Sequence, residues 1–273
     1  MSTPASPIGI FDSGIGGLTV VREVLRQLPH ERVIYFGDTA RVPYGPKSPD
    51  TVRRYSREIT EYLMSQDVKA IVVACNTATA HALPQLQREC TVPVIGVVEP
   101  GARAAVAASR RFELGVIGTS GTIGSGAYER AIRAIAPDAD IVARACPLFV
   151  PLVEEGWLDT EATRLIAREY LTPLQAAGID TLVLGCTHYP LLKPLLADVL
   201  GPDVILIDSA HETATETARI LQTRGLLSDE ATIGRSAVRR HRFIASDAPD
   251  HFLRLGQRFL GSAIECVETL TLG

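Results

Sequence analysis

Short runs of apolar, β-branched residues alternate with longer amphipathic segments along the chain. Residues 52–64, 160–177 and 212–222 carry apolar side chains at helical spacing, with charged residues on their other faces. The short apolar runs predict strands at residues 8–11, 33–36, 70–74, 94–98, 114–117, 141–143, 182–184, 204–207 and 242–245. This alternation predicts βαβ units and mostly parallel sheets flanked by helices, which is an α/β fold.

A second pattern is a repeat of strand ends between the two halves of the chain. Any one match is weak, because βαβ chains share Gly and Val patterns freely. Three pairs of segments match in the same order: 8–13 with 114–119, 73–77 with 184–188, and 94–98 with 204–208. Together they predict two similar half-structures.

The boundaries of the two halves follow from the segments that have no match in the other half. The chain after residue 210 matches nothing in the first half, and Pro100-Gly101 predicts a break after the first half's last matched strand. We therefore predict two pseudo-symmetric lobes, one formed by residues 1–98 and 211–273 and the other by residues 99–210. Ligands of open α/β sheets bind beyond the carboxyl ends of the strands, so the active site is expected in the cleft between the lobes.

Composition narrows the classes of function. With 46 % hydrophobic and 21 % charged residues, the chain is typical of a globular protein. Its net charge of −4 offers no long-range attraction to nucleic acid or to an anionic membrane surface, so neither is an expected partner. The first apolar run, residues 8–11, follows no basic residue and is too short for a signal peptide or a membrane span. We expect a cytoplasmic protein.

The five cysteines are an odd number in a chain without an export signal, which favours free thiols. Cys75 follows the predicted strand 70–74, and Cys186 follows the predicted strand 182–184. One strand-end cysteine is usually a small buried apolar residue. Two in matched positions of similar lobes instead predict one thiol on each side of a bound molecule. Racemisation of a carbon acid needs this geometry, since one thiolate removes the proton and the opposite thiol returns one.

Short polar residues stand beside both cysteines. A free thiol is mostly protonated at neutral pH, so the site must stabilise a thiolate, and His188 and Asp12 are the nearest candidates. Asn76, Thr77 and Thr187 are donors that could hold a substrate carboxylate. The alternative for each is a structural role in a cap or turn.

The glycines 14–17 open the helical stretch 18–28, where backbone amides can bind an anion. Thr19 occupies the position where a dinucleotide-binding motif needs glycine, and the chain has no phosphate-binding P-loop motif. Asp12 could accept from a substrate ammonium while Ser13 and the loop amides donate to a carboxylate. The alternative is that Asp12 only caps the helix.

Other chemistries remain as alternatives. Pyridoxal phosphate needs a Schiff-base lysine, and none of Lys47, Lys69 and Lys193 lies directly at a strand end beside a phosphate loop. A cysteine hydrolase using Cys186 would make the other cysteine dispensable.

A zinc-binding or regulatory module could use Cys75, Cys186 and His188, because thiolate and imidazole suit that metal. The chain has no C-x-x-C spacing and no obvious fourth ligand. We therefore expect neither a metal nor an organic cofactor.

Several longer motifs extend beyond the cysteines. Cys186-Thr187-His188-Tyr189-Pro190 is the most specific of them. The others lie at residues 11–18, 35–38, 43–45, 75–78, 94–97, 118–119, 147–156, 184–191, 207–209 and 259–261. Over nearly the whole chain, these motifs resemble the aspartate/glutamate racemase superfamily. Related aspartate and hydantoin racemases share the paired cysteines but differ after the second one, so His188 points to glutamate.

The resemblance implies an isomerase that interconverts L-glutamate and D-glutamate without a cofactor; a racemase of another amino acid, such as aspartate, is the alternative. It implies that Cys75 is the base toward D-glutamate, assisted by Asp12, and that Cys186 is the base toward L-glutamate, assisted by Glu154 and His188. It further implies a homodimer and a role in supplying D-glutamate for bacterial peptidoglycan, hence in cell-wall biogenesis and cell shape. The substrate-binding residues that it implies are Asp12, Ser13, Asp38, Tyr44, Gly45, Asn76, Thr77, Thr119, Thr187 and His188.

Overall fold

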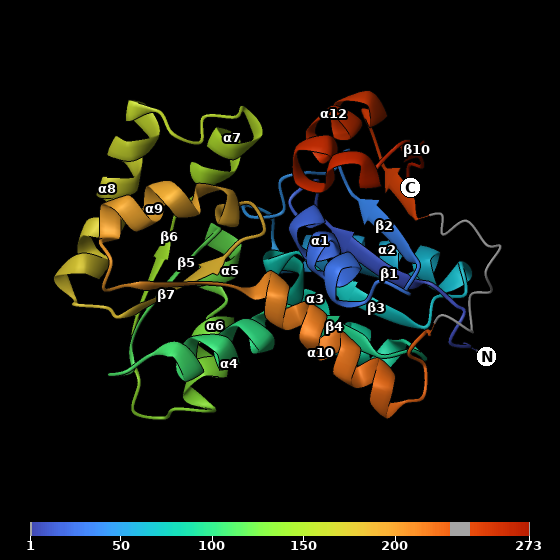
Figure 1. The fold of residues 1–273 in the computed structure, drawn as a ribbon, viewed down its shortest axis with the longest axis horizontal. Coiled ribbons are helices and arrows are strands. Elements are labelled where there is room, and N and C mark those ends of the chain that lie inside the picture. Colours follow the sequence, from blue (N-terminus) through green and yellow to red (C-terminus); the bar gives the residue numbers. More distant parts are fainter. Residues whose placement is uncertain (1, 230–240, 273) are drawn as a thin grey trace.

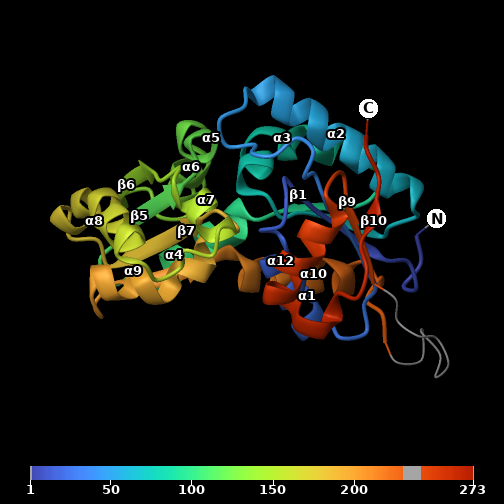
Figure 2. The ribbon, with the colours of Figure 1, turned by 90° about the horizontal axis from the view of Figure 1, so that it is seen from above.

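The computed structural model describes residues 2–229 and 241–272. These residues form two β-sheets that lie side by side, each covered by helices on both faces (Figure 1 and Figure 2). The larger sheet has six strands in the order β10-β9-β2-β1-β3-β4, and the smaller has four in the order β6-β5-β7-β8. All neighbouring strands within both sheets are parallel. The predicted α/β fold with two lobes is confirmed.

All nine predicted strands are present, and a short tenth strand, β10, is added near the C-terminus. The larger sheet contains β1 (Ile8–Asp12), β2 (Val33–Gly37), β3 (Ala70–Val73), β4 (Val94–Gly96), β9 (Arg242–Ala245) and β10 (Glu268–Thr269). The smaller sheet contains β5 (Glu113–Gly118), β6 (Asp140–Ala145), β7 (Thr181–Gly185) and β8 (Ile205–Asp208). The matched pairs β1/β5, β3/β7 and β4/β8 occupy equivalent places in the two strand orders, as the repeat predicts.

Each sheet carries one group of helices on each face. Against the larger sheet, α1 (Leu18–Gln27), α10 (Ser209–Thr223) and α12 (Pro249–Leu260) pack on one face, and α2 (Pro49–Ser65) and α3 (Asn76–Glu89) on the other. Against the smaller sheet, α4 (Val98–Ala108) and α6 (Ala127–Arg133) pack on one face, and α7 (Phe149–Glu154), α8 (Glu161–Ala176) and α9 (Lys193–Leu200) on the other. None of the helices in the described ranges is long and apolar enough to cross a membrane.

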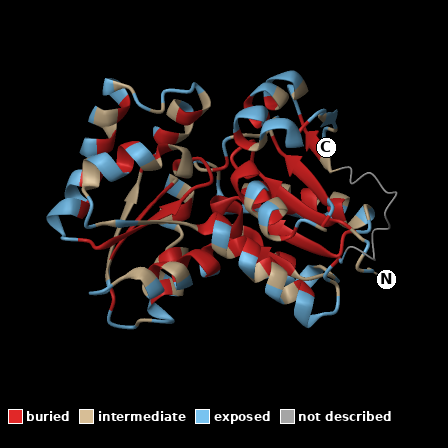
Figure 3. Ribbon diagram, viewed as in Figure 1, coloured by how far each residue is buried: buried red, intermediate tan, exposed pale blue. Residues whose placement is uncertain are grey.

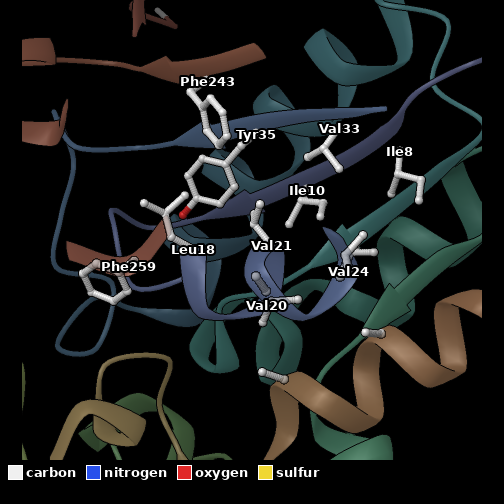
Figure 4. Packing of buried hydrophobic residues seen from close by; sticks show 14 of the residues in the cluster. Ile8, Ile10, Leu18, Val20, Val21, Val24, Val33, Tyr35, Phe243 and Phe259 are labelled. Atoms are coloured by element: carbon white, nitrogen blue, oxygen red, sulfur yellow. The ribbon is translucent and has the colours of Figure 1, made fainter. Parts of the chain in front are cut away.

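Side-chain periodicity explains how one strand serves two layers. In β1, Ile8 and Ile10 point toward α1, while Phe11 belongs to the core on the opposite face of the sheet (Figure 4). Val21 and Val24 of α1 are three residues apart, so they lie on the same side of that helix and contact the same core. Because both faces are covered, the inner strands and β4 are buried almost throughout, whereas the edge strands β6, β8 and β10 are half-buried or exposed. The helices are buried only on their inner sides (Figure 3).

Two helices carry the chain from one sheet to the other. Helix α4 follows β4 of the larger sheet and packs in the core of the smaller one, and α10 follows β8 and packs on the larger one. The two helices also meet through an ion pair between Arg103 and Glu216 at 3.0 Å. The lobe boundaries given above, with the second lobe at residues 99–210, stay a prediction.

Two details of the sequence-based prediction are wrong at the first crossing. The predicted strand 94–98 ends at Gly96, because Val98 already begins α4. Pro100 and Gly101 do not break the chain; they lie in the first turn of that helix. A proline is tolerated in a first helical turn, where its missing N–H has no partner to lose.

Candidate active site

The loops that follow β1, β2, β3, β5 and β7 line one small cavity between the two sheets. In this arrangement the cavity measures about 30 Å³, which is room for about one water molecule. The cavity in this arrangement is therefore too small to hold an amino acid. Of the predicted residues, those that line the cavity are Cys75, Cys186, Ser13, Tyr44, Gly45, Asn76, Thr77, Thr119, Thr187 and His188.

The three remaining predicted residues, Asp12, Asp38 and Glu154, do not line the cavity. Each instead contacts a residue that does. Asp12 lies 3.5 Å from the Thr187 hydroxyl, and Glu154 lies 3.0 Å from His188. Asp38 accepts a short hydrogen bond from the Tyr44 hydroxyl and is held by the guanidinium of Arg41 and the hydroxyl of Ser246. These carboxylates form a layer behind the lining residues.

Cys75 caps the N-terminus of α3. Its sulfur accepts from the amide of Ala78 at 3.5 Å and lies 3.8 Å from the Ser13 hydroxyl. Burial raises the pKa of the Cys75 thiol to about 12, and the nearby carboxylate of Asp12 adds to the rise, against the two hydrogen bonds. At neutral pH Cys75 is therefore a protonated thiol.

Cys186 has a different neighbour. Its sulfur lies 3.9 Å from Nδ1 of His188, whose Nε2 is 3.0 Å from Oε1 of Glu154. Burial disfavours a charged imidazole here, but the hydrogen bonds to Cys186 and Glu154 outweigh it and raise the pKa of His188 to about 10. His188 is thus a cation at neutral pH, and a cation beside the sulfur stabilises a thiolate.

The amides of the glycine loop after β1 do not all point to the place predicted for a substrate carboxylate. The amides of Gly14 and Gly17 donate to the Asp12 carboxylate at 3.2 and 3.1 Å, so these two amides are not available to a substrate carboxylate. That expectation is wrong for them. Asp12 is not the N-cap residue of α1 either, because that residue is Gly17; Asp12 instead holds the loop that leads into the helix. Asp12 is fully buried, and burial raises its pKa against the charge of His188 and the loop amides.

Threonine hydroxyls join the two lobes at the rim of the cavity. Thr77 of α3 lies 2.8 Å from Thr119 and 3.2 Å from Thr122, which belong to the other lobe. Nearby, the amide of Gly121 donates to the carbonyl of Gly45 at 2.8 Å. Thr119 also caps the short helix α5 (Ser120–Gly124) by accepting from the amide of Thr122. These bonds hold the cavity closed.

Gly16 is a site residue that sequence reasoning missed. A Cβ atom at this position would lie 2.4 Å from Oγ1 of Thr187 and 2.5 Å from Nδ1 of His188. Only glycine lets the loop after β1 come so close to the loop after β7. The sequence holds a weak signal, the glycine run itself, but nothing in it pairs residue 16 with residue 187.

Metal chemistry finds no support in this geometry. Within residues 2–229 and 241–272, no three or more His, Cys, Asp or Glu side chains are grouped so that they could hold a metal ion. The zinc alternative from the sequence needs such a group at Cys75, Cys186 and His188. All five cysteines are free.

Comparison with known proteins decides the family. A family model described as Asp/Glu/Hydantoin racemase matches residues 8–217. The chain belongs to this racemase family. A glutamate racemase of Geobacter metallireducens is 55% identical over 269 residues, which cover 98% of each chain.

Solved structures of the racemase family agree over the full fold. A glutamate racemase isoform from Bacillus anthracis gives a TM-score of 0.91 at 42% identity, covering 98% of this chain and 97% of that one. The glutamate racemase of Francisella tularensis, solved in complex with D-glutamate, gives 0.90 at 37% identity and covers 98% of both chains. The resemblance noted in the sequence is confirmed.

The contact at Gly16 yields a first prediction. In the variant Gly16→Ala the added methyl group pushes the loop of Thr187 and His188 away, so racemase activity should fall by at least about a hundredfold. The matched control is Gly124→Ala in α5, where a Cβ atom would meet nothing within 4 Å. Steady-state racemisation rates check this, with thermal unfolding to confirm that both variants fold. Full activity of Gly16→Ala would contradict the proposed close approach.

His188 yields a pH-dependent prediction. Its pKa is raised from 6.5 to about 10, so the folded protein holds this proton more tightly than the unfolded chain. The resulting stabilisation is complete below pH 6.5 and is lost as the pH rises through 10. The free energy of unfolding of the wild type should therefore fall, relative to that of His188→Asn, across this range. Urea denaturation at a series of pH values measures the difference, and a constant difference would mean that His188 is neutral in the folded protein.

Proposed function

We propose that this protein is an isomerase that interconverts L-glutamate and D-glutamate by proton transfer at the α-carbon, using two cysteines and no metal or organic cofactor. The observation that carries the proposal is that Cys75 and Cys186, from matched loops of two lobes, line the same cavity. Membership of the racemase family supports it, and so do full-length relatives named glutamate racemase.

The two thiols enter the reaction in different states. With L-glutamate, the Cys186 thiolate beside protonated His188 removes the α-proton, and the Cys75 thiol delivers a proton to the opposite face. The products are D-glutamate, a Cys186 thiol and a Cys75 thiolate. That final state is the one required for the reverse reaction, in which Cys75 is the base and Cys186 the acid. Proton exchange with solvent restores the resting state.

Assisting groups differ on the two sides. Glu154 orients His188, which keeps a positive charge beside Cys186. On the other side, the amide of Ala78 and the Ser13 hydroxyl stabilise negative charge on Cys75, while the buried Asp12 lies close enough to disfavour it. In the proposed reaction Asp12 assists the Cys75 side when it is itself protonated, a state that its raised pKa favours.

Neutral donors form most of the proposed substrate-binding set. Among residues 2–229 and 241–272, no lysine or arginine lines the cavity, whereas hydroxyl groups of Ser13, Thr77, Thr119 and Thr187 do. Together with Tyr44, Gly45, Asn76 and the cationic His188 they form the proposed binding set, with Asp12 and Asp38 behind them. Donors held in place in this way can bind both carboxylates and stabilise the negative charge that develops as the α-proton leaves.

One arrangement favours the rival function. Cys186, His188 and Glu154 form a line of nucleophile, base and orienting carboxylate, as in cysteine hydrolases. That function gives Cys75 no role, although Cys75 lines the same cavity in the equivalent place of the other lobe. Family membership and the second thiol together favour the racemase.

The deciding experiment follows the optical activity of L-glutamate and D-glutamate separately. We expect the wild type to bring both to a racemic mixture, and Cys75→Ser and Cys186→Ser each to lose at least about a hundredfold in rate. Cys266→Ser, which changes an exposed cysteine, is the control. A Cys75→Ser variant that still racemises glutamate would contradict the two-thiol mechanism, and a wild type that changes neither enantiomer would favour the hydrolase. Racemisation of aspartate but not glutamate would keep the mechanism and change the substrate.

Three broader proposals rest on the relationship to glutamate racemases. The protein works in the cytoplasm, forms a homodimer, and supplies D-glutamate for bacterial peptidoglycan. Sedimentation velocity of the purified protein checks the dimer, which a purely monomeric boundary would exclude. Restored growth of a bacterium that requires D-glutamate, when it expresses this chain but not Cys75→Ser, checks the biosynthetic role.

A further inference from the structure

Asn76 presents a buried donor that the protein itself does not use. It is the first residue of α3, follows Cys75 directly and lines the cavity. Its Oδ1 accepts a hydrogen bond from the Tyr128 hydroxyl at 2.7 Å, while its Nδ2 is buried without any partner among the described residues. Buried N–H groups without partners are rare in folded proteins, and this one belongs to a residue that lines the cavity.

Tyr128 reaches Asn76 from the other lobe. It is a residue of α6, fully buried in the core that α4 and α6 form with the smaller sheet. Two glycines give its ring the space that it occupies: a Cβ atom at Gly185 would lie 3.0 Å from the ring, and one at Gly101 would lie 3.3 Å from its hydroxyl. The ring is therefore held between β7 and the first turn of α4, with little freedom to move.

Ser209, the first residue of α10, lies beside Tyr128. A Cβ atom at Gly101 would lie 3.2 Å from the Cβ atom of Ser209 and 3.3 Å from the Tyr128 hydroxyl. Burial raises the pKa of Tyr128, and its hydrogen bond with Ser209 opposes that rise. At neutral pH the phenol keeps its proton, which it donates to Oδ1 of Asn76. This hydrogen bond fixes which end of the Asn76 amide faces Tyr128.

We propose that Tyr128 is a positioning residue, which fixes the Asn76 amide so that its NH2 group faces a substrate carboxylate. The role rests on the proposed function, since it needs an anionic substrate in the cavity. If the amide turned by half a revolution, its oxygen would face the carboxylate and repel it. Ser209 and Gly101 belong to α10 and α4, the two helices that cross between the lobes, so the orientation of this donor also depends on how the lobes sit.

The kinetic test compares two variants that each remove only a hydroxyl. Tyr128→Phe should lower kcat/KM for glutamate about tenfold, the loss expected for one misplaced donor to a charged group. Tyr170→Phe is the control, because its hydroxyl accepts a hydrogen bond from the amide of Leu148 within the smaller lobe and is not bonded to Asn76. It should change kcat/KM less than about twofold.

A double variant separates positioning from a general structural effect. If Tyr128 acts through Asn76, then Tyr128→Phe should cost almost nothing further in an Asn76→Ala background. Losses that multiply in the double variant would show that Tyr128 acts independently of Asn76, and would overturn the proposal.

An NMR measurement tests the hydrogen bond without relying on activity. The side-chain amide signals of Asn76, assigned by their absence from Asn76→Ala, should shift or broaden in Tyr128→Phe and stay unchanged in Tyr170→Phe. Unchanged signals in Tyr128→Phe would overturn the positioning role alone. A wild type that racemises nothing would instead overturn the proposed function, and with it any role of Tyr128 toward a substrate.

Discussion

The approach of Gly16 to Thr187 and His188 is the contact on which the site depends. A side chain at residue 16 would hold the loops after β1 and β7 apart, because a Cβ atom there would already lie 2.4 Å from the Thr187 hydroxyl. Because residue 16 has no side chain, the carboxyl ends of the strands of the two parallel sheets can approach each other. The same approach brings Thr187 to Asp12 and Cys186 to the cavity that Cys75 also lines. The parallel strands direct the loops of both sheets toward the cavity, and Gly16 allows the loops after β1 and β7 to come into contact.

The similarity of the lobes ends at the chemistry of their thiols. Cys75 caps a helix, and burial together with the nearby Asp12 raises its pKa, so the Cys75 thiol keeps its proton. Cys186 instead faces a protonated imidazole, which is held by Glu154. A racemase needs one acid and one base at any moment. Two thiols in identical surroundings could also hold one proton between them, because two thiolates in one small cavity repel each other, but neither thiol would then be preferred as the base. Unequal partners on an otherwise repeated backbone give the reaction a defined starting state.

Sequence patterns predicted the features that depend on residues close together in the chain, such as strands and the positions of the cysteines. Strand periodicity and matched strand ends located both sheets and the two cysteines, and the residues around Cys186 identified the family. Contacts between distant segments could not be predicted in this way. Nothing in the sequence joins Tyr128 to Asn76 or Gly16 to the second lobe, since both pairs form only after the sheets are packed. The start of α4 at Val98 was misjudged because β-branched residues favour a strand locally, and tertiary packing decided otherwise.

The closed cavity links substrate binding to the arrangement of the lobes. A space of about 30 Å³ leaves no room for bulk water beside the two thiols, and excluding water strengthens the charge interactions around them. The bonds that close it, between Thr77 and Thr119 and between Gly121 and Gly45, are neutral and few. Such bonds can open for a substrate at modest cost, because water replaces them. In the proposed function, closing around the substrate would restore these bonds, so that the contacts that exclude water would also hold the donors in place.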